Sequence, residues 1–429
     1  MSPDLAVTLV VFFFFMIMGM PLTFAMLFAC VVYLPLTGQP LYLITQQFFT
    51  GIDTFTLMAI PFFTLAGDLM VESGTAERSL KFANALVGRM RGGLAYVTVF
   101  SSMLFGGCSG SAIAEVAGLG PLQVRMMEKG GYSRAFSTAL MTSASIQGPI
   151  IPPSIPMVLV GAVTGTSIGG MLLGGAVPGV LVGVAMAVVI FVQSRKRKGI
   201  REPMTPRQFM RIVIESLPFL LMPFIIIGGI ISGFFTPTEA SATAVAYGLI
   251  LLVANDRGMP DLISLYRVCI RSAVLAATIL MLSGASNVFG WILATEQIPQ
   301  HVAELMFGIS DSPIVIMLIV NVFLLIWGMF MDMLPAIFII VPILMPLITK
   351  LGVDPVHFGV MVVFNLVLGL ITPPYGVALF TGSIVIGVPM EKIIRNMWPF
   401  FLSSLVVLML ITYVPDLIMV LPRLFGLDK

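Results

Sequence analysis

The sequence predicts an all-α polytopic membrane protein built as an inverted-topology repeat, with two re-entrant helical hairpins and two broken helices. Three observations predict this fold: the composition, an internal repeat of Gly and Pro, and the placement of basic residues. Hydrophobic residues make up 58% of the 429 residues and charged residues only 10%, whereas soluble domains carry about 25% charged residues. The chain therefore lacks the polar surface of a soluble protein, and we expect it to cross a membrane several times.

The internal repeat consists of two apolar stretches that are interrupted in the same way. Placing residue 148 over residue 369, a shift of 221 positions, superimposes Gly-Pro-Ile-Ile-Pro-Pro-Ser (break one, 148–154) on Gly-Leu-Ile-Thr-Pro-Pro-Tyr (break two, 369–375). From 106 to 178 the same shift gives ten identities, eight of them Gly or Pro, where composition alone gives about one. Gly and Pro record backbone shape. Interrupted helices at matching positions of two halves are typical of a transporter's binding site.

Basic residues set the expected orientation. Of the 22 Lys and Arg residues, 19 fall in five clusters, at 78–91, 125–134, 195–211, 257–271 and 392–395. The positive-inside rule places all five in the cytoplasm. The opposite side collects acids, namely Asp53, Glu296, Glu304, Asp311, Asp354 and Asp416. Both termini are then expected outside the cytoplasm, and the N-terminus lacks the basic start and cleavage site of a signal peptide.

In the first half, two spans are predicted within 5–36, separated at Gly19-Met20-Pro21, followed by a span near 54–72 and an amphipathic surface helix near 76–90. Residues 92–124 are apolar although both flanks are cytoplasmic, so we predict a re-entrant hairpin (hairpin one) that turns at 106–111. A broken helix at 131–165 and a span up to the basic loop at 195–211 complete this half.

The second half repeats the plan, with spans near 213–233 and 239–254, a cytoplasmic helix near 260–271 and a span near 272–292. Hairpin two, 313–349, turns at 328–332 between acidic flanks and should enter from the opposite face. A broken helix at 355–386 and a last span at 396–415 follow. The predicted segments are 1–91 (scaffold spans and surface helix), 92–194 (transport part), 195–212 (cytoplasmic basic linker), 213–312 (second scaffold part with its surface helix) and 313–429 (second transport part).

Several classes of protein are disfavoured by the same residues. The three cysteines lie in or beside apolar segments without paired spacing, so neither a disulfide framework nor a metal site is expected. Juxtamembrane topology explains the basic clusters, which removes the argument for nucleic-acid binding. No Ser/His or Asp/Asp pair, metal-ligand motif or phosphate loop points to an intramembrane enzyme. An ion channel would need several pore loops around one axis.

Four motifs carry a resemblance that covers nearly the whole chain. Residues 105–115 (FGGCSGSAIAE), 148–154 (GPIIPPS), 236–240 (TPTEA) and 369–376 (GLITPPYG) resemble the large membrane subunit of TRAP (tripartite ATP-independent periplasmic) transporters. The hairpin tip departs mildly, with Gly107 and Cys108 where small apolar residues are usual.

This resemblance implies sodium-coupled import of a small organic acid, of the sialic acid or C4-dicarboxylate type, across the bacterial inner membrane. It also implies an elevator mechanism, in which a transport domain slides against a scaffold. The expected partners are a small membrane subunit and a periplasmic substrate-binding protein. The alternative is a stand-alone sodium–dicarboxylate carrier of related inverted-hairpin fold, which needs no binding protein.

A helix broken inside the bilayer offers orphan carbonyl groups that suit Na⁺ and orphan N–H groups that suit a carboxylate. The resemblance and the shift together choose the residues of two expected Na⁺ sites. Site one comprises Gly106, Ser109, Ser111, Gly148, Ile151 and Pro153; site two comprises Gly328, Gly369, Thr372 and Tyr375, with Asp332 as a further candidate. No arginine is expected at the substrate, which would contact polar groups of Gln147, Ser154, Asn365, Thr381 and Ser383.

Other roles stay open for several of these residues. A Pro-Pro pair can be a simple kink, and Ser109 and Ser111 can bond to their own helix. Asp332 can bind Na⁺, accept a proton or cap a helix. Glu115 is expected to pair or hydrogen-bond within hairpin one, away from the substrate. Asp68 and Glu239 are expected to be partners of basic residues near span ends.

Overall fold

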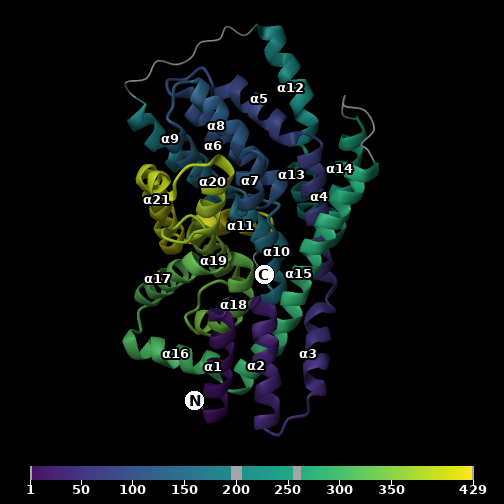
Figure 1. The fold of residues 1–429 in the computed structure, drawn as a ribbon, viewed down its shortest axis with the longest axis vertical. Helices are drawn as coiled ribbons and strands as arrows, with labels where there is room; N and C mark the ends of the chain where they lie inside the picture. Colours follow the sequence, from purple (N-terminus) through teal and green to yellow (C-terminus); the bar gives the residue numbers. More distant parts are fainter. Residues whose placement is uncertain (1, 195–204, 255–261, 428–429) are drawn as a thin grey trace.

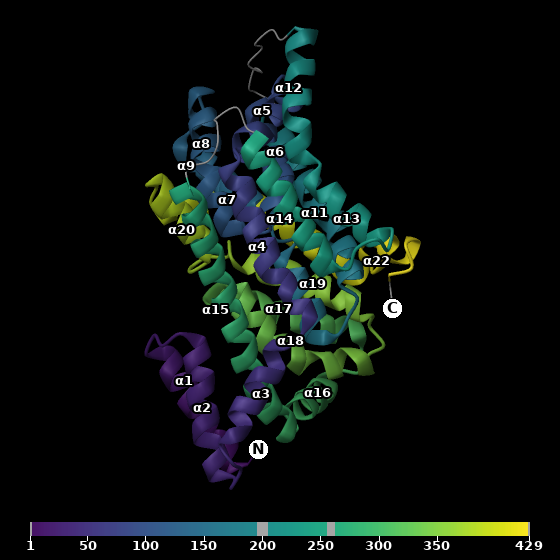
Figure 2. The same ribbon diagram turned by 90° about the vertical axis from the view of Figure 1, so that its right-hand side faces the viewer.

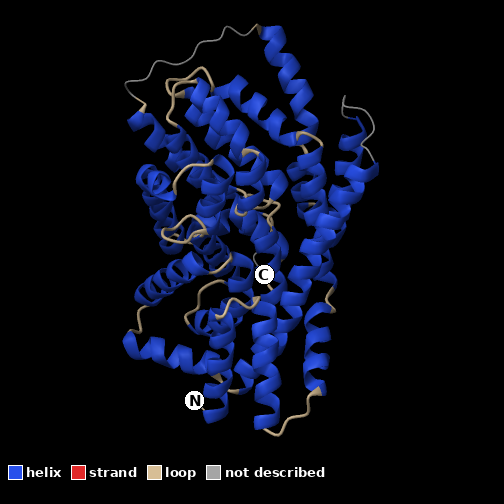
Figure 3. Ribbon diagram, viewed as in Figure 1, coloured by secondary structure: helices blue, strands red, loops and turns tan. Residues whose placement is uncertain are grey.

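The computed structural model describes residues 2–194, 205–254 and 262–427, and this part of the chain is helical and contains no strand (Figure 3). The first half comprises α1 (Pro3–Ile17), α2 (Leu22–Leu36), α3 (Tyr42–Ile52), η1 (Phe55–Met58), α4 (Ala59–Glu72), α5 (Thr75–Val87), α6 (Gly93–Ser109), α7 (Ala112–Gly118), α8 (Gly120–Lys129), α9 (Arg134–Ala144), η2 (Ser145–Gln147), α10 (Ile155–Thr164) and α11 (Ile168–Gln193). The second comprises α12 (Pro206–Leu220), α13 (Met222–Ile231), α14 (Pro237–Ala254), α15 (Leu262–Thr295), α16 (Ile298–Ile309), α17 (Pro313–Phe330), α18 (Met333–Lys350), α19 (Pro355–Gly369), α20 (Val377–Ile386), α21 (Met390–Tyr413) and α22 (Asp416–Leu424).

Seven helical segments of the described residues are long and apolar enough to cross a membrane: η1 with α4, α11, α14, α15, α17, α18 and α21. The pair α12 and α13, bent by 48°, would make an eighth. Large apolar side chains remain exposed along such helices, for example Ile314 at 64% and Val406 at 67%. Exposed apolar surface of this extent fits contact with lipid rather than water. The predicted polytopic helical membrane protein is confirmed.

The helices are arranged along one long axis (Figures 1 and 2). At one end lie α5, α8 and α12; at the other lie α1, α2, α3 and α16. Hairpin one, formed by α6 to α8, belongs to the first end, and hairpin two, formed by α17 and α18, lies toward the second. Between them, α10 packs against α18 and α20 packs against α7. Each short helix that follows a break is thus seated on the hairpin from the other half of the chain.

Helix bounds recur after the same shift of 221 positions. Helix α7 begins at Ala112 and α18 at Met333, while α8 and α18 end at Lys129 and Lys350. Helices α9 and α19 also begin 221 positions apart, at 134 and 355. The two hairpins differ at one point, because α18 is continuous where the first hairpin is interrupted between α7 and α8. Gly118 and Gly120 flank that interruption, and glycine weakens a helix interior.

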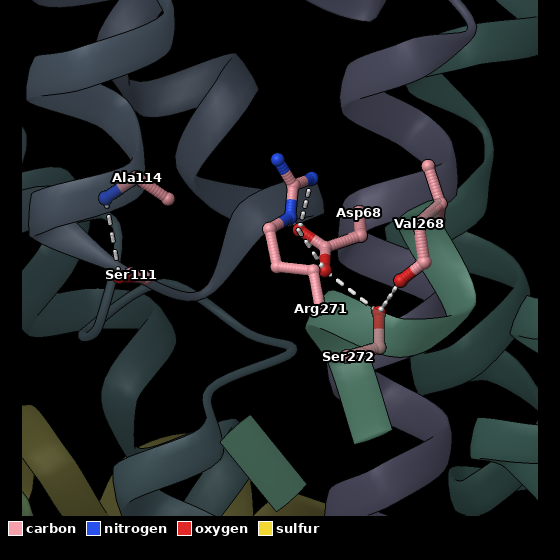
Figure 4. A network of polar contacts seen from close by, with 6 residues as sticks. All are labelled: Asp68, Ser111, Ala114, Val268, Arg271 and Ser272. Carbon is pink, nitrogen blue, oxygen red and sulfur yellow. Dashed lines mark hydrogen bonds and ion pairs between the residues drawn. The ribbon is translucent and has the colours of Figure 1, made fainter. Parts of the chain in front are cut away.

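A charged contact joins α4 to α15 (Figure 4). Asp68 Oδ1 accepts a hydrogen bond of 2.7 Å from Arg271 Nη2, and Oδ2 accepts one of 3.2 Å from Arg271 Nε. The Ser272 hydroxyl lies 2.7 Å from Asp68 Oδ2. The expectation that Asp68 is a partner of a basic residue is confirmed. Glu239 instead accepts from the backbone N–H of Thr236 at 2.8 Å, while the Thr236 hydroxyl oxygen accepts from Glu239 N–H at 3.3 Å at the start of α14. The expected basic partner is therefore wrong for Glu239.

We expect Asp68→Ala to lower the free energy of unfolding by about 1–2 kcal/mol, because two charge-assisted contacts are lost from a half-exposed pair. The matched control is Asp416→Ala. Its ion pair with Arg423 is short, at 2.6 Å, but both side chains are more than half exposed, and such pairs contribute little. Thermal unfolding of the purified protein in detergent measures both. Equal melting temperatures for the two variants would contradict the stabilising role of Asp68.

Three features of the fold differ from the sequence prediction, and a fourth predicted feature lies largely outside the described residues. The expected separate surface helix at 260–271 is wrong, because its described part, from Leu262, continues without a break to Thr295. Three short helices, α3, α16 and α22, were not anticipated. The expected single span at 213–233 is bent between α12 and α13. Most of the predicted basic linker, residues 195–204, and Arg257 lie outside the described residues.

Candidate functional site

Break one separates η2 from α10 and is almost fully buried. Ser154 ends it as the N-cap of α10, accepting from the N–H of Met157 at 3.3 Å, and its hydroxyl donates to the carbonyl of Pro149. The Pro152–Pro153 bond is cis. No hydrogen bond from a described residue reaches the carbonyl oxygens of Gly148, Ile151 or Pro153. Break one therefore presents three carbonyl groups, two of them on buried residues, that can still accept a donor or a cation.

The tip of hairpin one packs directly on break one. A Cβ atom on Gly106 would lie 2.8 Å from the Cα of Gly148, which shows how closely the two backbones approach. Gly110 turns the hairpin with φ of +61°, a conformation that suits glycine, and the carbonyl oxygen of Pro153 lies beside it. Ser111 then caps α7 by accepting from Ala114 N–H at 3.3 Å (Figure 4). Gly106, Ser111, Gly148, Ile151 and Pro153 thus lie at the contact between hairpin one and break one, whereas the backbone of Ser109 lies beside Gly67 of α4.

Break two has the same position in its half but a different hydrogen-bond pattern. The carbonyl of Gly369 accepts from Thr372 N–H at 3.0 Å, and that of Thr372 accepts from Gly376 N–H at 3.1 Å. The Thr372 hydroxyl donates to the carbonyl of Leu368 at 2.8 Å. The Pro373–Pro374 bond is cis. The carbonyl oxygens of Gly369 and Thr372 each keep one further lone pair for a cation, because a carbonyl oxygen has two.

Hairpin two meets break two through Gly328. A Cβ on Gly369 would lie 2.7 Å from the Cα and carbonyl carbon of Gly328. At the tip, the ring of Phe330 packs on the ring of Tyr375, which is 64% exposed, with centroids 5.5 Å apart. Asp332 caps α18 by accepting from Met333 N–H at 2.8 Å. Of its three open roles, the capping role is therefore present in the structure.

Buried oxygen atoms without a hydrogen-bond partner among the described residues gather in and near hairpin one. They are Ser109 Oγ, both carboxyl oxygens of Glu115, Gln123 Oε1 and Gln147 Oε1. Glu115 has a polar neighbour within the hairpin, the Ser102 hydroxyl of α6. The Ser102 hydroxyl faces its carboxyl group, yet no hydrogen bond of normal geometry reaches either oxygen. Buried acceptors are normally hydrogen-bonded, so unpaired ones indicate a site for a donor or a cation.

The five residues expected at the substrate are not brought together by side-chain contacts. The Ser154 hydroxyl donates to the carbonyl of Pro149 within break one. The hydroxyls of Thr381 and Ser383 donate to the carbonyls of Val377 and Val388. Gln147 Nε2 donates to the carbonyl of Ala144 at 3.2 Å. None of the five lines either of the two described cavities.

Asn365 belongs to a buried amide network that sequence reasoning missed in part. Its Nδ2 donates to Asn321 Oδ1 at 2.7 Å, and Asn321 Nδ2 donates to Thr412 Oγ1 at 3.0 Å. The network joins α17, α19 and α21 beside break two. Asn321 was overlooked, although an amide in the apolar run of α17 is itself a signal, because polar side chains at membrane depth are costly and usually functional.

Two cavities mark other parts of the molecule. The larger, about 860 Å³, lies between α5, α8 and α12 and is lined by the basic residues Lys81, Arg89, Arg125, Lys129 and Arg211. The smaller, about 400 Å³, lies between α3 and α15 on one side and α10 and α18 on the other. Ser283, Ser286 and Asn287 give its α15 wall a polar lining. Neither cavity carries a cluster of metal-ligating side chains among the described residues.

Comparison with known proteins places this architecture among transporters. Residues 9–417 match the family described as "Tripartite ATP-independent periplasmic transporter, DctM component". The chain is 40% identical to the sialic acid TRAP transporter large permease protein SiaM of Vibrio cholerae, over 95% of this chain and 96% of that one. It is 37% identical to the C4-dicarboxylate TRAP transporter large permease protein DctM of Pseudomonas aeruginosa, over 89% and 90%. The solved structure of the Alcanivorax borkumensis YdaH transporter has a similar fold, with a TM-score of 0.60, 15% identity and coverage of 91% and 97%.

Proposed function

Because the chain belongs to the DctM family of tripartite ATP-independent periplasmic transporters, we propose that it imports a small organic acid across the bacterial inner membrane by sodium-coupled secondary transport. Its relatives are transporter permeases, which confirms the reading of a transporter rather than an enzyme. The observation that carries the proposal is the pair of broken helices, each held against the tip of a hairpin.

Site one would hold Na⁺ between hairpin one and break one. The carbonyls of Gly148, Ile151 and Pro153 and the hydroxyl of Ser109 have no partner among the described residues. Oxygen atoms are the ligands that hard cations prefer, and here all four belong to segments in direct contact. Ser111 and Gly106 complete the expected set, Gly106 by allowing the close approach.

Site two would hold a second Na⁺ between Gly328, Asp332 and the carbonyls of Gly369, Thr372 and Tyr375. The first two of these carbonyls already accept a backbone hydrogen bond each, whereas the three carbonyls of site one accept none from the described residues. We therefore expect weaker Na⁺ binding at site two than at site one, because its ligands have less free acceptor capacity.

The substrate carboxylate would lie at the N-terminal ends of α10 and α20, where helix dipoles favour negative charge. Helix α10 is seated on hairpin two and α20 on hairpin one, so both N-terminal ends belong to the unit formed by the two hairpins. Gln147, Ser154, Asn365, Thr381 and Ser383 remain the candidate polar contacts. Sialic acid and C4-dicarboxylates are the compounds named for two relatives, and we propose an acid of this type.

The two hairpins would enter the membrane from opposite faces as an inverted repeat. Helices α5 and α8 lie at one end of the molecule (Figure 1), and their basic residues line the larger cavity. The positive-inside rule then assigns that end to the cytoplasm. Both termini would then be periplasmic. Hairpins and broken helices would form the transport domain of an elevator. A scaffold of α1–α5 and α12–α16 would stay fixed, braced by a small membrane subunit and supplied by a periplasmic binding protein.

Reconstituted uptake tests the proposal. Proteoliposomes would contain this chain with its small-subunit partner, with the cognate binding protein outside, in the presence or absence of an inward Na⁺ gradient. We expect uptake only when both Na⁺ and the binding protein are present. Uptake without the binding protein would favour the stand-alone carrier, and uptake driven by a pH gradient alone would rule out the sodium sites.

A further inference from the structure

Glu115 is a buried acid at the centre of the contact between hairpin one and break one. It lies on the first turn of α7, four residues after Ser111, and its side chain is 0% exposed. Its Oε2 lies 3.2 Å from the position that a Cβ on Gly148 would occupy, and the carbonyl carbon of Ser111 lies 3.4 Å from the same point. The carboxyl group is therefore directed at the first residue of break one.

Among the described residues, Glu115 has polar neighbours but no basic partner. Neither carboxyl oxygen has a hydrogen-bond partner among the described residues, and no described ion pair involves this residue. Its neighbours are Gly148, a residue whose carbonyl accepts no hydrogen bond from a described residue, and the hydroxyl of Ser102. A buried carboxylate without a counter-charge is strongly unfavourable. An arrangement of oxygens around one carboxylate suits a small cation.

We propose that the Glu115 carboxylate is the charged ligand of the cation that binds at break one. This inference rests on the proposed sodium coupling and adds a residue that the expected ligand set lacks. The carbonyl ligands of break one are neutral, so Glu115 would supply the negative charge that balances the cation. A cation held by a carboxylate and carbonyls is bound more tightly than one held by carbonyls alone, because charge-assisted contacts are the stronger ones.

The second half of the chain provides a contrast within the molecule. At the position that the shift of 221 matches to Glu115 stands Ala336, which is fully buried. The acid of hairpin two is instead Asp332, which already caps α18. The two sites therefore differ in where their acid stands, and only hairpin one directs a carboxyl group without a described partner at its break.

The test measures Na⁺ binding without transport. Purified protein in detergent is titrated with NaCl against choline chloride at constant ionic strength, without substrate, and thermal unfolding is followed. For Glu115→Gln we expect the half-saturating Na⁺ concentration to rise by about tenfold or more, since one charge-assisted contact corresponds to at least that factor. Glu115→Asp keeps the charge on a shorter side chain, and about a threefold rise is expected, which preserves the test should the glutamine variant fail to fold.

Glu304→Gln is the matched control, because Glu304 is an exposed acid of α16 and its loss should leave the Na⁺ concentration unchanged. An unchanged half-saturating concentration in Glu115→Asp, together with an unchanged or unmeasurable value in Glu115→Gln, would overturn the assignment of Glu115 alone. Absence of any Na⁺-dependent stabilisation in the unmodified protein would instead contradict the proposed sodium coupling.

Discussion

Replacing Gly369 by alanine is expected to reduce Na⁺-driven uptake by about 100-fold. The new Cβ would lie 2.7 Å from the Cα and carbonyl carbon of Gly328, closer than non-bonded carbon atoms approach. Both obstructing atoms are backbone atoms of α17, so no side-chain rotation relieves the clash. Hairpin two must then move away from break two, and a displacement of about 1 Å at a binding site can cost about 100-fold in rate. Initial uptake rates in proteoliposomes measure the effect.

The control is Gly228→Ala. Gly228 lies in α13, and a Cβ there would meet no atom within 4 Å. Uptake should be unchanged and stability slightly increased, because alanine favours a helix more than glycine. Near-normal uptake by Gly369→Ala, at an equal amount of folded protein, would show that the contact of hairpin two with break two is not needed for transport.

Cross-linking α15 to α18 is expected to abolish uptake almost completely. Helix α15 belongs to the proposed scaffold and α18 to the proposed transport domain, and both line the cavity of about 400 Å³. At this contact the Ser286 hydroxyl donates to the carbonyl of Phe338 at 2.6 Å. Cysteines at Ser286 and Ile343, both in the wall of this cavity, can be joined by a short bifunctional maleimide. An elevator requires one unit to slide past the other, which a covalent bridge prevents.

The design includes its own controls. Cys269 is exposed and is replaced by serine beforehand, whereas Cys30 and Cys108 are buried. The pair Ser283→Cys and Asn287→Cys lines the same cavity but lies entirely on α15, so the reagent fills the cavity without bridging the two units. Full uptake by the bridged protein, with cross-linking verified by mass spectrometry, would contradict relative sliding of α15 and α18.

The breaks and hairpins were predictable because they depend on local backbone chemistry. Pro152 and Pro153 remove two N–H donors in succession, so a helix cannot continue through them, whatever packs against it. The same holds at Pro373 and Pro374. Helix starts were equally local, since Ser111 and Asp332, 221 positions apart, both cap the helices that follow them. Backbone features of this kind appear in the sequence at the positions where they act.

Neither the continuity of α15 nor the hydrogen-bond environment of Glu115 was predictable, because both depend on contacts between separate helices. Arg271 and Ser272 look like the end of a surface helix, but Asp68, some 200 positions earlier, binds both and lies against an unbroken helix. From the sequence, Glu115 is expected to pair or hydrogen-bond within hairpin one. That, among the described residues, only the Ser102 hydroxyl faces it, without a hydrogen bond of normal geometry, depends on which side chains the folded hairpin turns toward it. Short helices such as α16, with 12 residues, fall below the length at which hydropathy identifies a span.

The unbroken length of α15 has a consequence for the lipid in which the protein works. Its 34 residues correspond to about 51 Å of helix at 1.5 Å per residue, against a hydrocarbon core of about 30 Å. Near one end it is bound to α4 through Asp68, and beyond the other end Glu296 accepts hydrogen bonds from Ser2 and Tyr33. A rod anchored at both ends cannot shorten when the bilayer becomes thinner, so the helix must tilt or the bilayer must deform around it. A change in bilayer thickness would therefore act on α15 together with the helices that anchor it at both ends.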